Sequence, residues 1–202
     1  MIRNLIFDFG KVLVDYDFKA VIDTFFDDPQ ELARFKELVL GKEFSEACDR
    51  EEIPFKDIIA QTKVAYPQWE REIQMVYDRY MDFVTVEVPG MRNLLTRYKA
   101  EGYKLYGLTN WCKVVYKVIE KYDILQMLDD RVISSEEHVI KPEPAIYQRL
   151  LDKFNLKPEE CVFTDDKAVN VEGARKAGMH GIVFHDAAQY ESELKDILHR
   201  TI

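Results

Sequence analysis

Short apolar runs alternate with helical patterns along most of the chain. Val115, Val118, Ile119 and Tyr122 recur with helical spacing, and Gly178 stands where a helix ending at Ala177 needs its cap. The runs are strand-sized and rich in β-branched or aromatic residues: Leu5 to Asp8, Tyr103 to Asn110, Arg131 to Ser135, Cys161 to Asp166, and Gly181 to Phe184. This alternation predicts an α/β fold, with a doubly wound parallel sheet covered by helices on both faces.

The segment from residue 17 to residue 86 has a different pattern, which is helical almost throughout. Its helix-start signals are Asp28-Pro29, Pro54 and Pro67. Val88-Pro89-Gly90 then returns the chain to a helix followed by a strand. We predict a Rossmann-like core domain of residues 1–16 and 87–202, with a small helical cap domain of residues 17–86 inserted after the first strand. The position of this insert favours a lid over the strand ends.

Composition narrows the class of protein. Of 202 residues, 47% are hydrophobic and 32% are charged, which is typical of a soluble protein with a packed core. The formal net charge of −9 argues against nucleic acids and anionic membranes as partners. No apolar run approaches the length of a membrane span or the core of a signal peptide. We therefore expect a cytoplasmic protein.

Residues with chemical potential lie at the ends of the predicted strands, where a doubly wound sheet binds its ligands. An acidic residue at one strand end is most often a helix cap, but four ends with complementary chemistry are harder to dismiss. The relevant segments are Asp8-Phe9-Gly10-Lys11, Thr109-Asn110-Trp111, Lys141 after the third run, and Asp165-Asp166 followed by Asn170.

This set of side chains suits phosphoryl transfer. A carboxylate such as Asp8 can attack phosphorus and form an aspartyl-phosphate, which divides one difficult displacement into two easier ones. Mg²⁺ prefers carboxylates, waters and phosphate oxygens, so Asp8 and the Asp165-Asp166 pair can hold it. Lys141 would neutralise charge on the attacking carboxylate and on the phosphoryl oxygens. Thr109 and the backbone N–H groups after it offer donors to the phosphate.

In this order, the motifs resemble those of the haloacid dehalogenase (HAD) superfamily over essentially the whole chain. The similarity is to the subfamily with a helical cap after the first strand, and to its sugar-1-phosphate phosphatase branch. The matching segments are Leu5 to Leu13, Leu108-Thr109-Asn110, Ile140-Lys141-Pro142-Glu143-Pro144, and Val162 to Asp166 with Asn170 to Ala174.

The resemblance implies a Mg²⁺-dependent phosphatase in which Asp8 is the nucleophile. Its partner would be a small phosphorylated metabolite, and the protein would be a monomer or weak dimer. Lys141 would be the charge-balancing lysine, and Thr109 would bind the phosphoryl group with Asn110 beside it. Lys11 is a candidate second cation near the phosphate, although it can equally be a solvated surface lysine. Trp111 follows the phosphate-binding pair and is a candidate for the substrate pocket or for ordinary packing.

The resemblance also implies a metal site. Asp8, the backbone carbonyl of Gly10 and Asp166 would be direct ligands, and Asp165 would help directly or through water. Asn170 takes the place of the last acidic residue of the family motif and would orient the groups around the metal.

One departure from the family pattern concerns the general acid and base. The usual phosphatase motif is Asp-x-Asp-Gly-Val, but this chain has Gly10 in place of the second aspartate and Lys11 after it. Asp15 and Asp17 could replace the lost group, or could cap the first lid helix. The sugar-1-phosphate phosphatase branch has the same glycine, which favours a small sugar phosphate similar to glucose 1-phosphate as substrate.

Three other functions are weighed. A 2-haloacid dehalogenase shares the nucleophile but needs no metal, and the Asp165-Asp166 pair argues against it because adjacent carboxylates without a cation repel each other. A phosphomutase needs an acid-base residue that Gly10 cannot provide. A non-catalytic phosphate-binding or regulatory protein is disfavoured by the presence of Asp8, Thr109 and Lys141.

Overall fold

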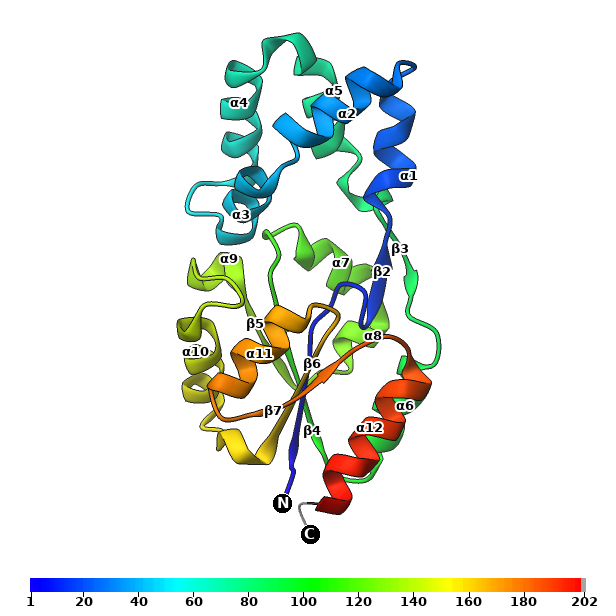
Figure 1. Ribbon diagram of the computed structural model, residues 1–202, viewed down its shortest axis with the longest axis vertical. Coiled ribbons are helices and arrows are strands. Elements are labelled where there is room, and N and C mark those ends of the chain that lie inside the picture. Colours follow the sequence, from blue (N-terminus) through cyan, green and yellow to red (C-terminus); the bar gives the residue numbers. More distant parts are fainter. Residues whose placement is uncertain (201–202) are drawn as a thin grey trace.

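A five-stranded parallel sheet forms the centre of the computed structural model, which describes residues 1–200 (Figure 1). The strands lie in the order β5-β4-β1-β6-β7. Their bounds are β1 (Asn4–Phe7), β4 (Lys104–Thr109), β5 (Asp130–Ile133), β6 (Cys161–Asp165) and β7 (His180–Val183). The five apolar runs of the sequence are thus the five strands, and the predicted α/β fold is confirmed.

The register of the sheet brings the functional strand ends together. Phe7 at the end of β1 pairs with Gly107 of β4 and with Thr164 of β6. The next residue, Asp8, donates its backbone N–H to the carbonyl of Thr164 at 2.9 Å. Asp8 and Asp165 therefore leave the sheet side by side at its carboxyl edge.

Helices cover both faces of the sheet because successive residues of a strand point to opposite sides. Leu5 and Phe7 of β1 belong to one buried cluster, and Ile6 belongs to the other. The first cluster includes residues of α6 (Met91–Ala100), α7 (Val115–Lys121), α8 (Asp123–Gln126) and α12 (Ala187–Arg200). The second includes residues of α10 (Pro144–Phe154) and α11 (Ala168–Lys176), and the short α9 (Ser134–Glu137) follows β5.

A helical segment lies beyond the carboxyl edge of the sheet, and we call it the cap (Figure 1). It consists of α1 (Phe18–Ile22), α2 (Pro29–Leu38), α3 (Lys42–Arg50), α4 (Phe55–Ala65) and α5 (Glu70–Asp78). The start signals act as expected at α2 and α4. Asp28 caps α2 by accepting the N–H of Gln30 at 2.8 Å, and Pro54 directly precedes α4.

Two short antiparallel strands, β2 (Val14–Tyr16) and β3 (Val84–Glu87), carry the chain into and out of the cap. The sequence analysis did not identify this ribbon, because strands of such length show too little alternation to stand out. The remaining elements are short 3₁₀ turns at Asp23–Phe25, Pro67–Trp69, Tyr80–Asp82 and Pro158–Glu160. Among residues 1–200, no helix combines the length and the apolar character that crossing a bilayer requires.

Candidate active site

Lys141 is the centre of a buried ionic network at the carboxyl edge of the sheet. Its ammonium lies 2.9 Å from Oδ1 of Asp8 and 2.7 Å from Oδ2 of Asp165, and it donates to the carbonyl of Leu108 at 2.9 Å. Burial alone would lower the pKa of Lys141, but the charges of Asp165 and Asp8 raise it above its usual value. Lys141 is therefore a permanent cation between two carboxylates.

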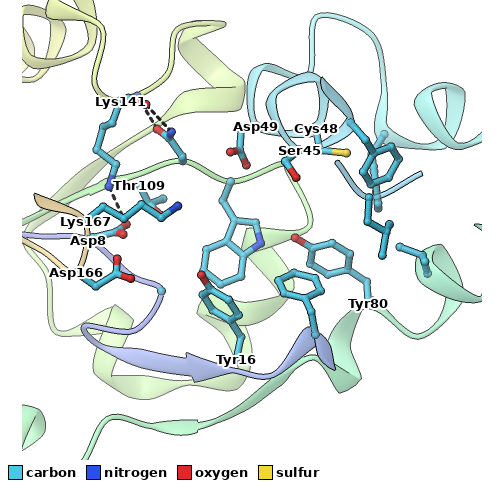
Figure 2. A pocket seen from close by; sticks show the side chains of 18 of the residues that line it. Asp8, Tyr16, Ser45, Cys48, Asp49, Tyr80, Thr109, Lys141, Asp166 and Lys167 are labelled. Carbon is cyan, nitrogen blue, oxygen red and sulfur yellow. Dashed lines mark hydrogen bonds and ion pairs between the residues drawn. The ribbon is translucent and has the colours of Figure 1, made fainter. Parts of the chain in front are cut away.

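The two adjacent aspartates at the end of β6 have different surroundings. Asp165 is fully buried, and Asn170 Nδ2 donates to both of its oxygens at 3.1 and 3.0 Å. The backbone N–H of Lys167 also donates to Asp165, at 2.8 Å. Asp166 instead lines the cavity described below, with its carboxylate toward Asp8 (Figure 2). Asp165 thus orients Lys141 and Asn170, while Asp166 faces the ligand space.

The carboxylates of this site are suited to a divalent cation. Asp8, Asp165 and Asp166 each place an oxygen within 4.8 Å of the others. Burial, with repulsion from Asp165, raises the pKa of Asp8 to about 6 despite the attraction of Lys141. Burial and Asp165 also raise the pKa of Asp166. Such repulsion between carboxylates is what a bound cation relieves, and oxygen ligands of this kind are those that Mg²⁺ takes.

The end of β4 supplies a hydroxyl that fits a phosphate oxygen. Thr109 is 1% exposed, and its Oγ1 has no hydrogen-bond partner among the described residues. A buried hydroxyl without a partner is costly, so a ligand oxygen is a natural acceptor for it. Asn110 has a different task. Its side-chain amide accepts the N–H of Lys141 at 2.8 Å and donates to the carbonyl of Lys141 at 3.1 Å, so it positions that lysine.

Trp111 and Gly10 also line the cavity. The backbone N–H of Trp111 donates to Ser134 Oγ at 2.9 Å, so this N–H group is bonded within the protein and does not bind a phosphate. A Cβ atom at Gly10 would lie 2.6 Å from Cε1 of Tyr16. The ring of Tyr16 therefore occupies the space next to residue 10, where the family has its acid-base aspartate.

The structure places Lys11, the predicted second cation near the phosphate, outside the cavity. It is absent from the cavity wall, and its ammonium binds the carboxylate of Asp15 and, at 2.6 Å, the carbonyl of Tyr16. Asp17 caps α1 by accepting the N–H of Ala20 at 2.8 Å. Asp15 and Asp17 both lie outside the cavity wall.

A cavity of about 510 Å³ extends from these strand ends into the cap. Its cap side is largely apolar, with Phe18, Ile22, Leu40, Phe44, Phe55, Val76 and Tyr80 in its wall. The cavity wall also contains residues that the sequence motifs did not single out, among them Tyr16, Asp49 and Lys167 (Figure 2). Lys167 could have been found, since it directly follows Asp166 at a strand end. Tyr16 and Asp49 gave no signal, because they reach the site only through the placement of the β2–β3 ribbon and of α3.

Asp49 is an unusual carboxyl group for a cavity wall. Burial raises its pKa to about 7, with repulsion from Asp8 and Glu46 acting in the same direction. Lys167 and Lys141 act in the opposite direction by stabilising the charged form. Burial and the charges of Asp166 and Asp8 raise the pKa of Tyr16, so its phenol remains protonated at neutral pH.

Among curated proteins, the chain is similar to several enzymes that act on phosphate esters. It is 30% identical over 131 residues to glyceraldehyde 3-phosphate phosphatase of Pyrococcus furiosus, a match that spans 64% of this chain and 55% of that protein. It is 25% identical over 195 residues to flavin mononucleotide hydrolase 1 of Arabidopsis thaliana, spanning 96% and 76%. It is 24% identical over 217 residues to D-ribitol-5-phosphate phosphatase of Bacteroides thetaiotaomicron, spanning 98% and 99%.

Solved structures share the fold. A predicted HAD-like hydrolase from Porphyromonas gingivalis has a TM-score of 0.76 at 21% identity, covering 98% of both chains. A HAD family enzyme from B. thetaiotaomicron, in complex with magnesium and inorganic phosphate, has a TM-score of 0.73 at 21% identity, covering 92% of this chain and 96% of that one. The sequence profile of the haloacid dehalogenase-like hydrolases matches residues 2–178. The chain therefore belongs to the haloacid dehalogenase-like hydrolase family, as its motifs predict.

Proposed function

We propose that this protein is a Mg²⁺-dependent phosphatase that hydrolyses a small phosphomonoester through an aspartyl-phosphate on Asp8. The observation that carries the proposal is the network in which Lys141 joins Asp8 to Asp165 at the strand-end side of the cavity. A nucleophilic carboxylate held by a permanent cation, next to an unpaired hydroxyl of Thr109, is an arrangement suited to phosphoryl transfer.

Asp8 is well oriented for the attack on phosphorus. Its Oδ1 accepts hydrogen bonds from Lys141 Nζ at 2.9 Å and from the N–H of Phe9 at 2.7 Å, so the carboxylate cannot rotate freely. Lys141 would also reduce repulsion between Asp8 and the incoming phosphate, and the Thr109 hydroxyl would donate to a phosphoryl oxygen.

The metal site follows from the same geometry. Asp8, Asp166 and the backbone carbonyl of Gly10 would hold Mg²⁺, and Asp165 would act through Lys141 and Asn170, because its oxygens already accept their hydrogen bonds. When bound, the cation supplies positive charge that lets a phosphate dianion approach a carboxylate.

For the substrate, we propose a sugar phosphate or a related polyol phosphate. Two relatives of the chain are named for such compounds, glyceraldehyde 3-phosphate and D-ribitol 5-phosphate. Glucose 1-phosphate, the compound favoured by Gly10, stays a prediction. The net charge of −9 and the phosphate site together favour a small metabolite over a nucleic acid as the partner.

A second substrate class is a phosphomonoester with an aromatic ring. Phe44, Phe55, Tyr80 and Trp111 line the cavity, and aromatic walls favour planar apolar groups. One relative, similar over 96% of this chain, is named a flavin mononucleotide hydrolase. The substrate panel should therefore include flavin mononucleotide beside the sugar phosphates.

Phosphate release from this panel, with a nitrophenyl phosphate added, tests the function. We expect release that requires Mg²⁺, stops with a chelator and disappears in Asp8→Asn, because the amide cannot replace the carboxylate as nucleophile and form the acyl phosphate. Asp15→Asn is the matched control, since Asp15 lies nearby but outside the cavity wall. Release by Asp8→Asn at the rate of the control would contradict the mechanism. Absence of release from every compound would favour a binding protein, or a dehalogenase to be tested with 2-haloacids.

A further inference from the structure

Gly10 removes the group that normally moves protons in this reaction, and the structure leaves few substitutes. The ring of Tyr16 fills the space beside Gly10, but its phenol keeps its proton at neutral pH. A neutral phenol cannot accept a proton from water in the second step of the reaction. Asp15 and Asp17 lie outside the cavity wall. A substitute must therefore come from another part of that wall.

Asp49 is a carboxyl group that reaches the same space from the cap. It lies in the last turn of α3 and lines the cavity together with Asp8, Thr109 and Lys141. Figure 2 shows its carboxylate extending from the cap side toward the labelled core residues. Electrostatic interaction with Asp8, Lys141 and Lys167 places Asp49 within the field of the reacting groups.

The chain around Asp49 is fastened to the core, so its position does not depend on the cap alone. Ser134 Oγ donates to the carbonyl of Asp49. The next residue, Arg50, forms an ion pair with Glu143, and its carbonyl lies 2.8 Å from Nδ1 of His138. These contacts hold the end of α3 against the segment that follows β5, close to Lys141 in the chain.

A second contact joins the end of α3 to a different loop of the core. The side chain of Glu51 accepts a hydrogen bond from the backbone N–H of Lys113, which lies in the loop that follows β4. Glu51 is buried although it belongs to the cap. Residues directly after Asp49 are thus bound to two strand-end loops of the core, a degree of fixation that a catalytic group needs.

We propose that Asp49 is the general acid and base of this enzyme, in place of the aspartate that Gly10 lacks; this inference rests on the proposed phosphatase function. In the first step, an oxygen of Asp8 bonds to phosphorus, the ester P–O bond breaks, and the carboxylic acid of Asp49 gives its proton to the leaving oxygen. In the second step, the Asp49 carboxylate takes a proton from water as the water oxygen bonds to phosphorus. The bond between phosphorus and Asp8 breaks, which releases inorganic phosphate and restores protonated Asp49.

The charges that face Asp49 suit both directions of proton transfer. Its pKa of about 7 means that both the acid and the carboxylate are populated near neutral pH. Asp8 and Glu46 favour the acid, while Lys167 and Lys141 favour the carboxylate. A carboxyl group at its usual pKa would be ionised almost completely and would be a poor proton donor at that pH.

Asp49→Asn separates the two chemical steps when nitrophenyl phosphate is the substrate. Nitrophenolate needs little protonation, so Asp8 should still become phosphorylated, whereas hydrolysis of the aspartyl-phosphate lacks its base. We expect turnover to fall by about 10²–10⁴-fold. A burst of about one nitrophenolate per enzyme should precede this slow phase, and intact-protein mass should reveal phosphorylated Asp8. Glu43→Gln, an exposed acidic residue in the first turn of the same helix, is the matched control.

Each outcome has one meaning. A burst with trapped phosphoenzyme in Asp49→Asn, at unchanged circular dichroism, supports the assignment. Turnover within about threefold of wild type overturns it. So does equal loss of both steps without phosphoenzyme, since that indicates a displaced cap. A burst in Tyr16→Phe in place of Asp49→Asn would assign the role to Tyr16 instead. If wild type releases no phosphate, the proposed function itself fails.

Discussion

The two ends of the cavity differ in how their side chains are held. At the core end, Asp8, Lys141, Asp165 and Asn170 bind one another in a buried network. At the cap end, the wall consists mainly of aromatic and aliphatic side chains such as Phe44 and Phe55. Polar networks require defined distances and angles, whereas an apolar wall requires only shape. The comparison suggests that the core end performs the chemistry and the cap end selects the substrate.

The sheet explains why the side chains at the core end of the cavity have well-defined positions. Every residue of β1 and β6 is buried, and both strands run in register to the same edge. The side chains that follow them therefore start from fixed backbone positions. The cap has no such framework. It is connected to the core by a two-stranded ribbon and by the contacts of Asp49 and Arg50, at the end of α3, with Ser134 and Glu143. Asp49 is the exception in this comparison, an acidic cap residue whose backbone carbonyl accepts a hydrogen bond from Ser134 of the core.

The largest effect should follow from breaking the core network. Lys141→Met leaves Asp8 and Asp165 buried without their cation, so the free energy of unfolding should fall by about 3–5 kcal/mol at pH 8, with loss of activity. Urea denaturation measures this change. Lys11→Met is the control, because its partly exposed pair with Asp15 is worth at most about 1 kcal/mol. Equal falls in the free energy of unfolding of the two variants would mean that the buried core network contributes no more to stability than the partly exposed pair of Lys11 and Asp15.

A smaller and different effect is expected at the apolar wall. Phe44→Ala should raise KM by about 5–50-fold and leave kcat within about threefold, because the wall binds substrate and transition state alike. The increase should be greater for flavin mononucleotide or nitrophenyl phosphate than for a sugar phosphate. Steady-state kinetics measures both constants, with Leu38→Ala, an exposed residue outside the wall, as control. A fall in kcat at constant KM would assign Phe44 to the chemical step and contradict a purely substrate-binding role of the cap end.

Asp49 should also affect how the stability of the protein depends on pH. Its pKa is raised from 3.8 to about 7, so the folded protein loses stability as the pH rises between these values. Asp49→Asn carries no charge and avoids this loss. We expect the variant to be more stable than wild type by about 1–3 kcal/mol at pH 8 without added metal, and equal to it at pH 4. Thermal unfolding at both pH values measures the difference, and lower stability of the variant at pH 8 would contradict it.

The smallest effect is expected at Lys11. Its ammonium binds Asp15 and the carbonyl of Tyr16, away from the ligand space. Lys11→Met should therefore change kcat/KM by less than about threefold, whichever phosphate ester is used. A loss of tenfold or more would return Lys11 to the site and require a rearrangement of the β1–β2 turn on substrate binding.

Sequence motifs were reliable where the chain itself fixes the position of a side chain. Asp8, Thr109 and Asp166 directly follow or end buried strands, so strand prediction also predicted their convergence. Lys11, by contrast, has positive φ and turns toward Asp15. No local pattern distinguishes Asp49 from the exposed acidic residues of its helix, because its role depends on how α3 packs against the core.

Local patterns in the sequence were sufficient to predict the parallel sheet, the helical insert, the family and the residues at the strand ends. Hydrophobic periodicity and short motifs are local properties, and parallel strands bring their carboxyl ends to one edge whatever the details of packing. The tertiary structure was needed to show that Asp165 binds Lys141 and Asn170 while its neighbour Asp166 faces the cavity. Only the tertiary structure brought Tyr16 to the space beside Gly10 and Asp49 to the cavity wall. Those placements depend on the packing of elements far apart in the chain, which no local pattern encodes.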